Sequence, residues 1–505
     1  MAEYSTIAAV DLGSNSFHCQ IARVVGDQIY PLDALREPVR LGAGLNADKR
    51  LEEAAQERAL ACLERFGERL RGFDRHAVRA AGTNTLRVAK NAAAFLKKAR
   101  GALGFPIEVV AGREEARLIY LGVSHSLPTS PEKRLVVDVG GGSTELIIGQ
   151  NHKPLRLESL FMGCVSYSLR FFPEGKITKS AMKEADTLAR IELQPIVARF
   201  ARRNWEQAVG SSGTARALAE ILQLAGYTDG SITSDGLERL RSHLVKAGDM
   251  SRIDLRGLRA DRGPVLPGGL AIMNATLSEL KVDSMVTTTG SMRQGMLYDM
   301  LGRLHHRDMR NVTVAQFMQR YHVDAQQARR VATLALKLHA TLTAGEKQPD
   351  EEAPRLIAWA AKLHEIGISV AYSGYHKHSA YIIANADMPG FSRLEQLRLS
   401  QLVLGHRRSL RKNRDQFDPD TDWRLLIALR LAVLFHLGRT DVAVPVQDAT
   451  AQGRKFRITL EREWLARNPL TAAALREEMK QWQEFGFDVA IKPLPEPEAA
   501  DLAAA

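Results

Sequence analysis

The pattern of hydrophobic and polar positions along the chain contains the same short unit twice. An apolar run that ends in aspartate leads into a turn of small and polar residues, and a second apolar-rich run follows. Aliphatic and β-branched residues favour strands, whereas Gly, Ser and Asn favour tight turns. We therefore predict two strand–turn–strand units, formed by Ala8–Asp11, Gly13–Ser16 and Phe17–Ala22 and by Leu135–Asp138, Gly140–Ser143 and Glu145–Ile148.

These two turns differ from the phosphate loops that open a helix, because a strand pattern follows each of them. Successive backbone N–H groups in such a turn can point at one spot and bind an anion. The aspartates that end the first strands, Asp11 and Asp138, suit a divalent cation that bridges to phosphate. Either turn alone is also typical of a simple hairpin. The repetition favours a duplicated domain that holds phosphate between its halves.

Helices and strands alternate through the rest of the first half. Helical spacing covers residues 51–71, a short strand covers 76–81, and a helix capped near Thr83 is expected to continue to Arg100. Arg87 lies one turn into that helix. It is either a solvated helix charge or a phosphate clamp, and the sequence favours neither.

A strand at 106–110 leads into a helix whose first turn carries Glu114 and Glu115. Acidic residues are common in a first helical turn because they offset the positive end of the helix dipole. The functional alternative is that one carboxylate faces the phosphate site and orients a water molecule. The alternation of strands and helices up to about residue 125 restarts at 135, which indicates two α/β halves.

A third turn with glycines, residues 209–216, lies in the second half and precedes a predicted helix from Ala217 to Leu224. The N-terminus of a helix attracts anions because its backbone N–H groups are unpaired. We therefore predict a third anion-binding turn around Gly213.

From about residue 313 the pattern is nearly continuous helix, and residues 455–491 are predicted as strand, helix and strand. Within the helical part, the stretch 406–414 contains five Lys and Arg residues. Such a run is either a solvated face or a surface that binds a polyanion. We predict four segments: the α/β halves 1–125 and 126–305, a helical domain 306–442, and a small α+β domain 443–505 with a frayed tail.

The composition is that of a globular protein with several domains: 505 residues, 45% hydrophobic and 25% charged. A formal net charge of +11 favours polyanionic partners, and it also permits peripheral association with an anionic membrane surface. No motif indicates a specific nucleic acid. Three cysteines without metal-ligand spacing fit a reducing compartment. Because the chain also lacks a signal-peptide pattern and a bilayer-length apolar run, we expect a cytoplasmic protein.

Four segments together resemble the exopolyphosphatase/guanosine-pentaphosphatase family, and the match is close to its long, four-domain bacterial exopolyphosphatases. They are Val10–His18, Gly82–Arg87, Gly112–Tyr120 and Asp138–Glu145. The resemblance implies duplicated actin-like (ribonuclease H-like) ATPase-fold halves, followed by an all-helical domain similar to His-Asp phosphohydrolases. It implies processive release of orthophosphate from inorganic polyphosphate, with Mg²⁺ and K⁺, by a homodimer. Some members instead remove the 5′ γ-phosphate of guanosine pentaphosphate, which yields guanosine tetraphosphate.

The resemblance also implies roles for single residues. Glu115 matches the catalytic base and Arg87 the arginine of the cleft. The acidic positions linked to metal and water match Asp138 and Glu145, with Asp11 as a further candidate. The terminal phosphate would be held by the residues of the turns, which are Gly13, Ser14, Asn15, Ser16, Gly140, Gly141, Gly142, Ser143 and Gly213.

The helical domain resembles the His-Asp phosphohydrolases only in part. Glu365 follows His364 where that superfamily has a metal-binding aspartate, which puts a second metal centre in doubt. We therefore expect the domain to be a binding platform, on which a polyphosphate track is formed by His378, His406, Arg407, Arg408 and Arg411.

Two functions from other classes remain as alternatives. An actin-like kinase would need an adenosine pocket, for which Gly210–Arg216 is the candidate. A non-catalytic sensor of phosphate or guanosine tetraphosphate would need only the turns. A helix that begins with carboxylates, added to two acid-flanked phosphate turns, is more than binding requires. We therefore expect a hydrolase, with polyphosphate as the first substrate candidate and guanosine pentaphosphate as the second.

Overall fold

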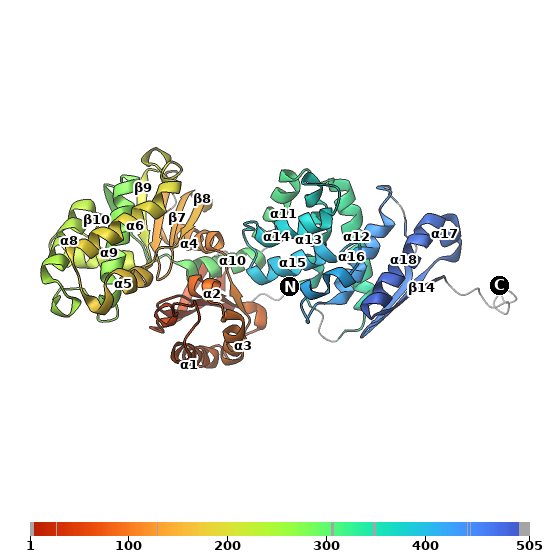
Figure 1. Ribbon diagram of the computed structural model, residues 1–505, viewed down its shortest axis with the longest axis horizontal. Helices are drawn as coiled ribbons and strands as arrows, with labels where there is room; N and C mark the ends of the chain where they lie inside the picture. Colours follow the sequence, from red (N-terminus) through yellow and green to blue (C-terminus); the bar gives the residue numbers. More distant parts are fainter. Residues whose placement is uncertain are drawn as a thin grey trace. The chain divides into compact units, whose positions relative to one another are not determined.

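The computed structural model describes residues 5–26, 28–128, 130–304, 308–346, 350–441, 443–444 and 446–493 (Figure 1). The chain divides into two compact units, Met1–Met309 with Pro389–Arg393, and Arg310–Met388 with Leu394–Ala505. The predicted boundaries at 305/306 and 442/443 and the tail after 493 fall on residues outside this description. The division into four domains therefore stays a prediction. None of the helices in the described ranges has the length and apolar character needed to cross a membrane.

The first sheet has the strand order β3-β2-β1-β4-β5. The first three strands of the chain pair antiparallel, and β1, β4 and β5 pair parallel. Every residue from Ile7 to Val10 in the central strand is buried, as expected for a strand covered on both faces. The strands are β1 (Thr6–Leu12), β2 (Phe17–Val25), β3 (Gln28–Glu37), β4 (Val78–Gly82) and β5 (Ile107–Val109).

The second sheet, of order β10-β11-β9-β6-β7-β8, repeats this arrangement. Again three consecutive strands pair antiparallel, and the first of them continues into parallel neighbours. This repetition confirms the predicted duplication of an α/β half. The strands are β6 (Lys133–Val139), β7 (Thr144–Gln150), β8 (Lys153–Leu160), β9 (Gln207–Ser211), β10 (Ile232–Thr233) and β11 (Ser284–Thr287).

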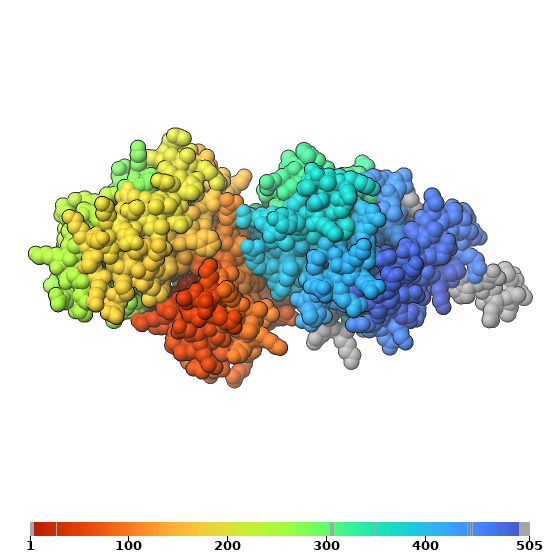
Figure 2. Space-filling view, viewed as in Figure 1, coloured from red at the N-terminus to blue at the C-terminus, as the bar shows by residue number. Residues whose placement is uncertain are grey.

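Helices cover the outer face of each sheet. In the first half, α1 (Glu53–Arg69) and α3 (Ala92–Leu103) share a core with the sheet. Figure 2 shows the two halves as adjacent red and yellow lobes of the first unit. The second half is covered by α5 (Cys164–Phe171), α6 (Lys179–Val197), α7 (Ser212–Leu224), α8 (Ser234–Ala247) and α9 (Leu266–Leu280), whose apolar residues form one core with that sheet.

Two helices, α4 (Gly112–Ser126) and α10 (Met292–Leu304), lie between the sheets. Their apolar residues join one core with residues of β1 from the first sheet and β6 from the second. The two helices touch through their backbones: a Cβ added to Gly295 would lie 1.8 Å from the Leu118 carbonyl oxygen, and one added to Gly122 would lie 2.0 Å from that of Ser291. Helix α4 is thereby fixed between the halves.

The helix predicted from Thr83 to Arg100 is interrupted. The structure has α2 (Asn84–Val88) and α3, with Ala89 in an extended conformation between them. The break is stabilised by Asn91, whose side chain accepts from the Leu51 N–H at 2.8 Å and donates to the Leu51 carbonyl at 3.0 Å. This pairing with a distant residue was not visible in the local sequence pattern.

The second unit combines helices with a small sheet of order β12-β13-β14. Strand β12 was not predicted, whereas the strand–helix–strand pattern after it was. The elements are α11 (Met309–Arg320), α12 (Ala325–Leu342), α13 (Ala353–Leu363), α14 (Tyr375–Asn385), α15 (Arg393–Gly405), α16 (Trp423–Phe435), β12 (Val446–Gln452), β13 (Lys455–Leu460), α17 (Arg462–Arg467), α18 (Pro469–Phe485) and β14 (Asp488–Pro493).

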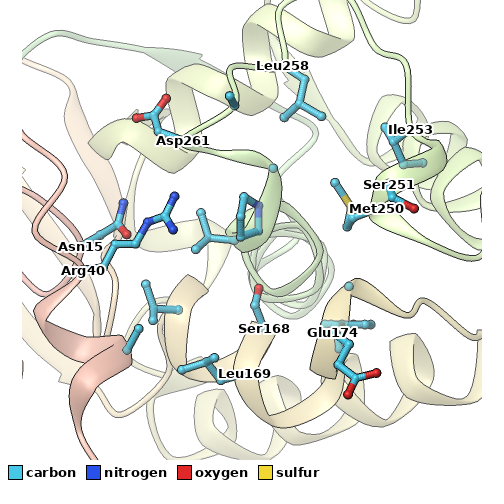
Figure 3. A pocket seen from close by; sticks show the side chains of 18 of the residues that line it. Asn15, Arg40, Ser168, Leu169, Glu174, Met250, Ser251, Ile253, Leu258 and Asp261 are labelled. Atoms are coloured by element: carbon cyan, nitrogen blue, oxygen red, sulfur yellow. The ribbon is translucent and has the colours of Figure 1, made fainter. Parts of the chain in front are cut away.

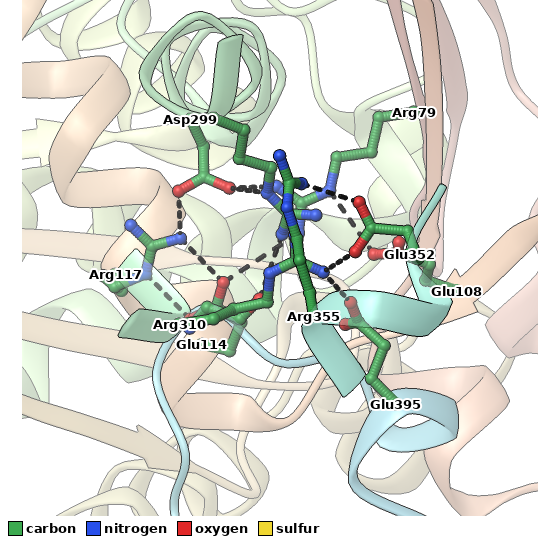
Figure 4. Close-up of polar contacts among 11 residues, drawn as sticks. Arg79, Glu108, Glu114, Arg117, Asp299, Arg310, Glu352, Arg355 and Glu395 are labelled. Carbon is green, nitrogen blue, oxygen red and sulfur yellow. Dashed lines mark hydrogen bonds and ion pairs between the residues drawn. The ribbon is translucent and has the colours of Figure 1, made fainter. Parts of the chain in front are cut away.

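A buried arginine ties three helices of this unit together. Arg310 donates to Glu352 at 2.9 Å and to Glu395 (Figure 4). Its guanidinium also lies 4.6 Å from the ring centre of Trp359. The Arg310 side chain is 2% exposed. A buried guanidinium is tolerated because its charge is paired and its donors are used.

Candidate active site

The two predicted turns lie together in a cleft between the halves of the first unit. A cavity of about 490 Å³ is lined by Gly13–Ser16 from one half and Gly140–Ser143 from the other. The turns are packed so closely that a Cβ added to Gly141 would lie 2.9 Å from the Ser14 Cβ. A residue with a side chain at this position would force the turns apart, so glycine is required by the approach of the two halves.

Acidic side chains at the strand ends face the same cleft. Asp11, Glu115 and Asp138 line the cavity, whereas Glu145 and Arg87 do not. Asp138 accepts from the Ser211 hydroxyl at 2.7 Å, and Glu145 accepts from the Ser159 hydroxyl at 2.7 Å.

Burial and mutual repulsion favour the protonated forms of these acids. Burial is the main cause that raises the pKa of Asp11 to about 7 and that of Asp138 to about 6. The pKa of Glu145 is also raised well above its usual value, by burial and then by Glu115 and Asp138. The neighbouring arginines therefore do not fully offset the effect of burial on these carboxyl groups.

Glu115 and Glu114 point into different surroundings although they are adjacent on α4. Glu115 accepts a hydrogen bond from Arg87 Nη1 at 2.6 Å, and the same nitrogen donates to the Val110 carbonyl at 3.0 Å. Arg87 therefore does not line the cavity itself but contacts Glu115, which does. Of the two alternatives for the acidic helix start, the geometry assigns Glu115 to the cleft.

Glu114 belongs to a buried network of ion pairs (Figure 4). Arg117 binds both of its carboxylate oxygens at 2.8 Å, and the Gly390 N–H donates to it at 2.9 Å. Asp299 of α10 accepts from Arg117 and from Arg79, each at 2.6 Å. Removing one partner of a buried pair typically costs about 3–5 kcal/mol, because a charge is left uncompensated. The network thus holds the first turn of α4 in place.

Five arginines also line the cavity. The pKa values of Arg216, Arg262 and Arg293 are lowered, first by burial. Repulsion from neighbouring arginines is a further cause. No local sequence signal marked these residues as one group, because they come from distant segments. The arginines that line the cavity are Arg36, Arg216, Arg259, Arg262 and Arg293.

The third predicted turn also reaches the cavity, but its helix begins earlier than expected. Helix α7 starts at Ser212, whose φ of 81° is unusual for a residue with a side chain. Gly213 lines the cavity, and a Cβ added there would lie 1.9 Å from Arg262 Nη2. The Arg262 guanidinium therefore lies against the turn that was expected to bind an anion by its backbone alone.

The predicted polyphosphate track in the second unit is only partly at the surface. Arg408 and Arg411 are exposed, and His378 and Arg407 are half-buried. His406 is buried, and its Nδ1 is 2.5 Å from the Val403 carbonyl oxygen. Arg407 lies 4.5 Å from the ring centre of Tyr375. The exposed arginines can meet a ligand in solution, whereas His406 is part of the core.

His364 is also buried, and its ring centre lies 5.1 Å from that of His406. Its neighbour Glu365 is paired with Arg439 at 2.6 Å. Across the described ranges of both units, no group of three or more His, Cys, Asp or Glu side chains is placed to enclose a metal ion.

Comparison with known proteins adds independent information. The model of the Ppx/GppA phosphatase family matches residues 20–304, and the model of its domain III matches residues 309–479. Proteins named guanosine-5′-triphosphate,3′-diphosphate pyrophosphatase, from Vibrio cholerae and Vibrio vulnificus, are each 37% identical over 487 residues, 96% of this chain and 98% of theirs.

Among solved structures, an exopolyphosphatase from Cytophaga hutchinsonii superimposes with a TM-score of 0.53 at 27% identity, covering 59% of this chain and 97% of its own. An exopolyphosphatase-like protein at 23% identity, with a TM-score of 0.54, supports the same fold. The duplicated sheets, the paired turns and these matches agree, and the chain belongs to the Ppx/GppA phosphatase family.

Proposed function

We propose that this phosphatase removes the 5′ γ-phosphate of guanosine pentaphosphate in the cleft between its halves. The observation that carries the proposal is the meeting of the two turns with Glu115 in one cavity. The sequence favoured polyphosphate as the first substrate. The names of the full-length relatives reverse that order and favour the guanosine substrate.

Hydrolysis of a phosphoanhydride depends on an aligned water and on stabilised phosphoryl oxygens rather than on covalent help. The turns 13–16 and 140–143 hold the terminal phosphoryl group. Glu115 orients the attacking water and accepts its proton. Arg87 fixes the Glu115 carboxylate by a hydrogen bond at 2.6 Å, so the carboxylate is held ready before substrate binds.

The acids at the cleft fit a bound Mg²⁺. Mg²⁺ usually takes one or two carboxylates together with phosphate oxygens and waters, so it needs no cage of three acidic side chains. Asp11 and Asp138 are the candidates that line the cavity, whereas Glu145 is buried and does not line it. Burial is the first cause of the raised pKa values of Asp11 and Asp138, and a bound cation would favour the ionised carboxylates. When bound, Mg²⁺ would neutralise charge on the phosphoryl oxygens. K⁺ remains an expectation from the resemblance.

The arginine wall supplies a second place for negative charge. Arg216, Arg262 and Arg293 line the same cavity as the two turns. A substrate with a second phosphorylated group, such as the 3′-diphosphate of guanosine pentaphosphate, would pair with these guanidinium groups while its 5′ end reaches Glu115.

Polyphosphate is the second candidate substrate. The structural relative at 27% identity is named an exopolyphosphatase, and exposed Arg408 and Arg411 could contact a long anion. A long polyphosphate chain would need contacts outside the cleft, whereas a nucleotide would not need them.

The first prediction concerns the proposed base. Glu115→Gln keeps the size of the side chain but removes its capacity to accept a proton, so orthophosphate release should fall by roughly 10²–10⁴-fold. Binding of guanosine tetraphosphate, measured by calorimetry, should persist. Glu220→Gln is the matched control, because Glu220 lines the same cavity and is exposed. Release near the wild-type rate from the Glu115 variant would remove Glu115 from the mechanism.

The second prediction concerns pH and Mg²⁺. When folding raises the pKa of an acid, the protonated acid contributes to the stability of the folded protein. This contribution to stability is lost as the pH rises from the pKa of the unfolded state to the pKa of the folded state. The loss occurs between pH 3.8 and about 7 for Asp11, and between pH 3.8 and about 6 for Asp138. Mg²⁺ should therefore raise Tm more at pH 8 than at pH 5, in scans against a chelator control.

The Asp11→Asn variant keeps the shape of the side chain and removes one titrating group. In this variant the rise in Tm caused by Mg²⁺ should depend less on pH than in the wild type. An equal Mg²⁺ effect at both pH values in the wild type would show that these acids do not hold the cation.

The third prediction concerns the surface of the second unit. Reversing the charge of Arg408 and Arg411 to Glu should slow turnover of long-chain polyphosphate more than that of tripolyphosphate, because only long chains reach beyond the cleft. Arg329→Glu with Lys337→Glu is the charge-matched control, since both residues are exposed on α12. Equal losses on long and short chains would contradict a track.

A further inference from the structure

A second cavity of the first unit, of about 720 Å³, opens between its two halves (Figure 3). The first half contributes Asn15, Arg40 and Ala43. The second half contributes residues of α5 and of the segment 250–265. Nothing in the hydrolysis of a terminal phosphate requires a cavity of this size, so its lining needs an explanation.

This cavity adjoins the phosphate cleft, and the two share lining residues. Asn15, which belongs to the first phosphate turn, lines both cavities, and so does Arg259. Asp261 lines the second cavity and accepts from Arg36 at 2.5 Å, and Arg36 lines the cleft. The two cavities therefore meet at Asn15, so a ligand that occupied both would pass this residue.

The lining of the second cavity mixes polar and apolar side chains, and the apolar ones are more numerous. Figure 3 shows Asn15, Arg40 and Asp261 on one side and Met250 and Ile253 on the opposite side. The wall also contains the polar residues Ser168, Glu174 and Ser251. Further apolar residues that line the cavity are Val165, Leu169, Phe172, Leu258, Pro264 and Val265. A chain of phosphates has no apolar surface to bury. Sites for small organic ligands, in contrast, combine apolar walls with a few polar groups that fix orientation.

We propose that this second cavity holds the guanosine nucleoside of the substrate, an inference that rests on the proposed function. The 5′ phosphates then run past Asn15 to the paired turns, and the base lies among the apolar side chains. Asp261 provides the acceptor for the N–H edge of guanine. Its carboxylate accepts from Arg36 and Arg259, which leaves further lone pairs free for the base.

Leu169→Trp tests the proposal by filling the second cavity. The Leu169 side chain lines the cavity and is 56% exposed, so a larger residue there should not disturb the core. The KM for guanosine pentaphosphate should rise about tenfold more than the KM for tripolyphosphate, because only the nucleotide needs this space. Guanosine tetraphosphate should also bind more weakly to the variant in calorimetry.

Ile191→Trp is the matched control. Ile191 is 53% exposed on α6 and lies outside both cavities, so its replacement should leave the two KM values unchanged. Equal changes for both substrates in the Leu169 variant, or no change for either, would overturn the nucleoside site. If the wild-type protein releases orthophosphate from polyphosphate but not from guanosine pentaphosphate, the proposed function itself fails, and the two failures are distinguishable.

Discussion

The site depends on how the first turn of α4 is held between the two sheets. Glu114 is bound by Arg117, which also pairs with Asp299 of α10, and all three side chains are buried. Close backbone packing of α4 against α10 prevents the helix from shifting. Because Glu114 is fixed on one side of the helix, the adjacent Glu115 is directed into the cleft, where Arg87 completes its orientation. Of two neighbouring carboxylates, one thus belongs to a buried ion-pair network and the other lines the cavity proposed as the active site.

The cleft brings acidic and basic side chains together in one cavity. Asp11 and Asp138 lie at the ends of the paired strands, and the arginines come from the surrounding segments. Acids that repel one another favour a cation, whereas arginines that repel one another favour an anion. A phosphorylated substrate accompanied by Mg²⁺ would place a cation beside the acids and phosphate oxygens beside the arginines. This arrangement matches a reaction that relies on position and electrostatics, because phosphoryl transfer asks little else of the protein.

The sequence pattern predicted the parts of the site that are encoded locally. The strand–turn–strand units and the acidic helix start depend on neighbouring residues, so their periodicity and turn chemistry were readable. Long-range pairing was not readable. The side chain of Asn91 breaks a predicted helix by bonding to Leu51, and Arg36, Arg216 and Arg293 meet only after folding. His406 looked like part of a basic surface, yet it follows the end of α15 and packs in the core beside His364.

The most direct measurement compares orthophosphate release by the wild-type protein from guanosine pentaphosphate and from polyphosphate of defined length. The two substrates are supplied at matched concentrations with Mg²⁺, and the nucleotide product is identified. The account predicts guanosine tetraphosphate and orthophosphate in equal amounts, formed faster than orthophosphate from polyphosphate. Guanosine pentaphosphate left intact in the presence of Mg²⁺ would contradict it.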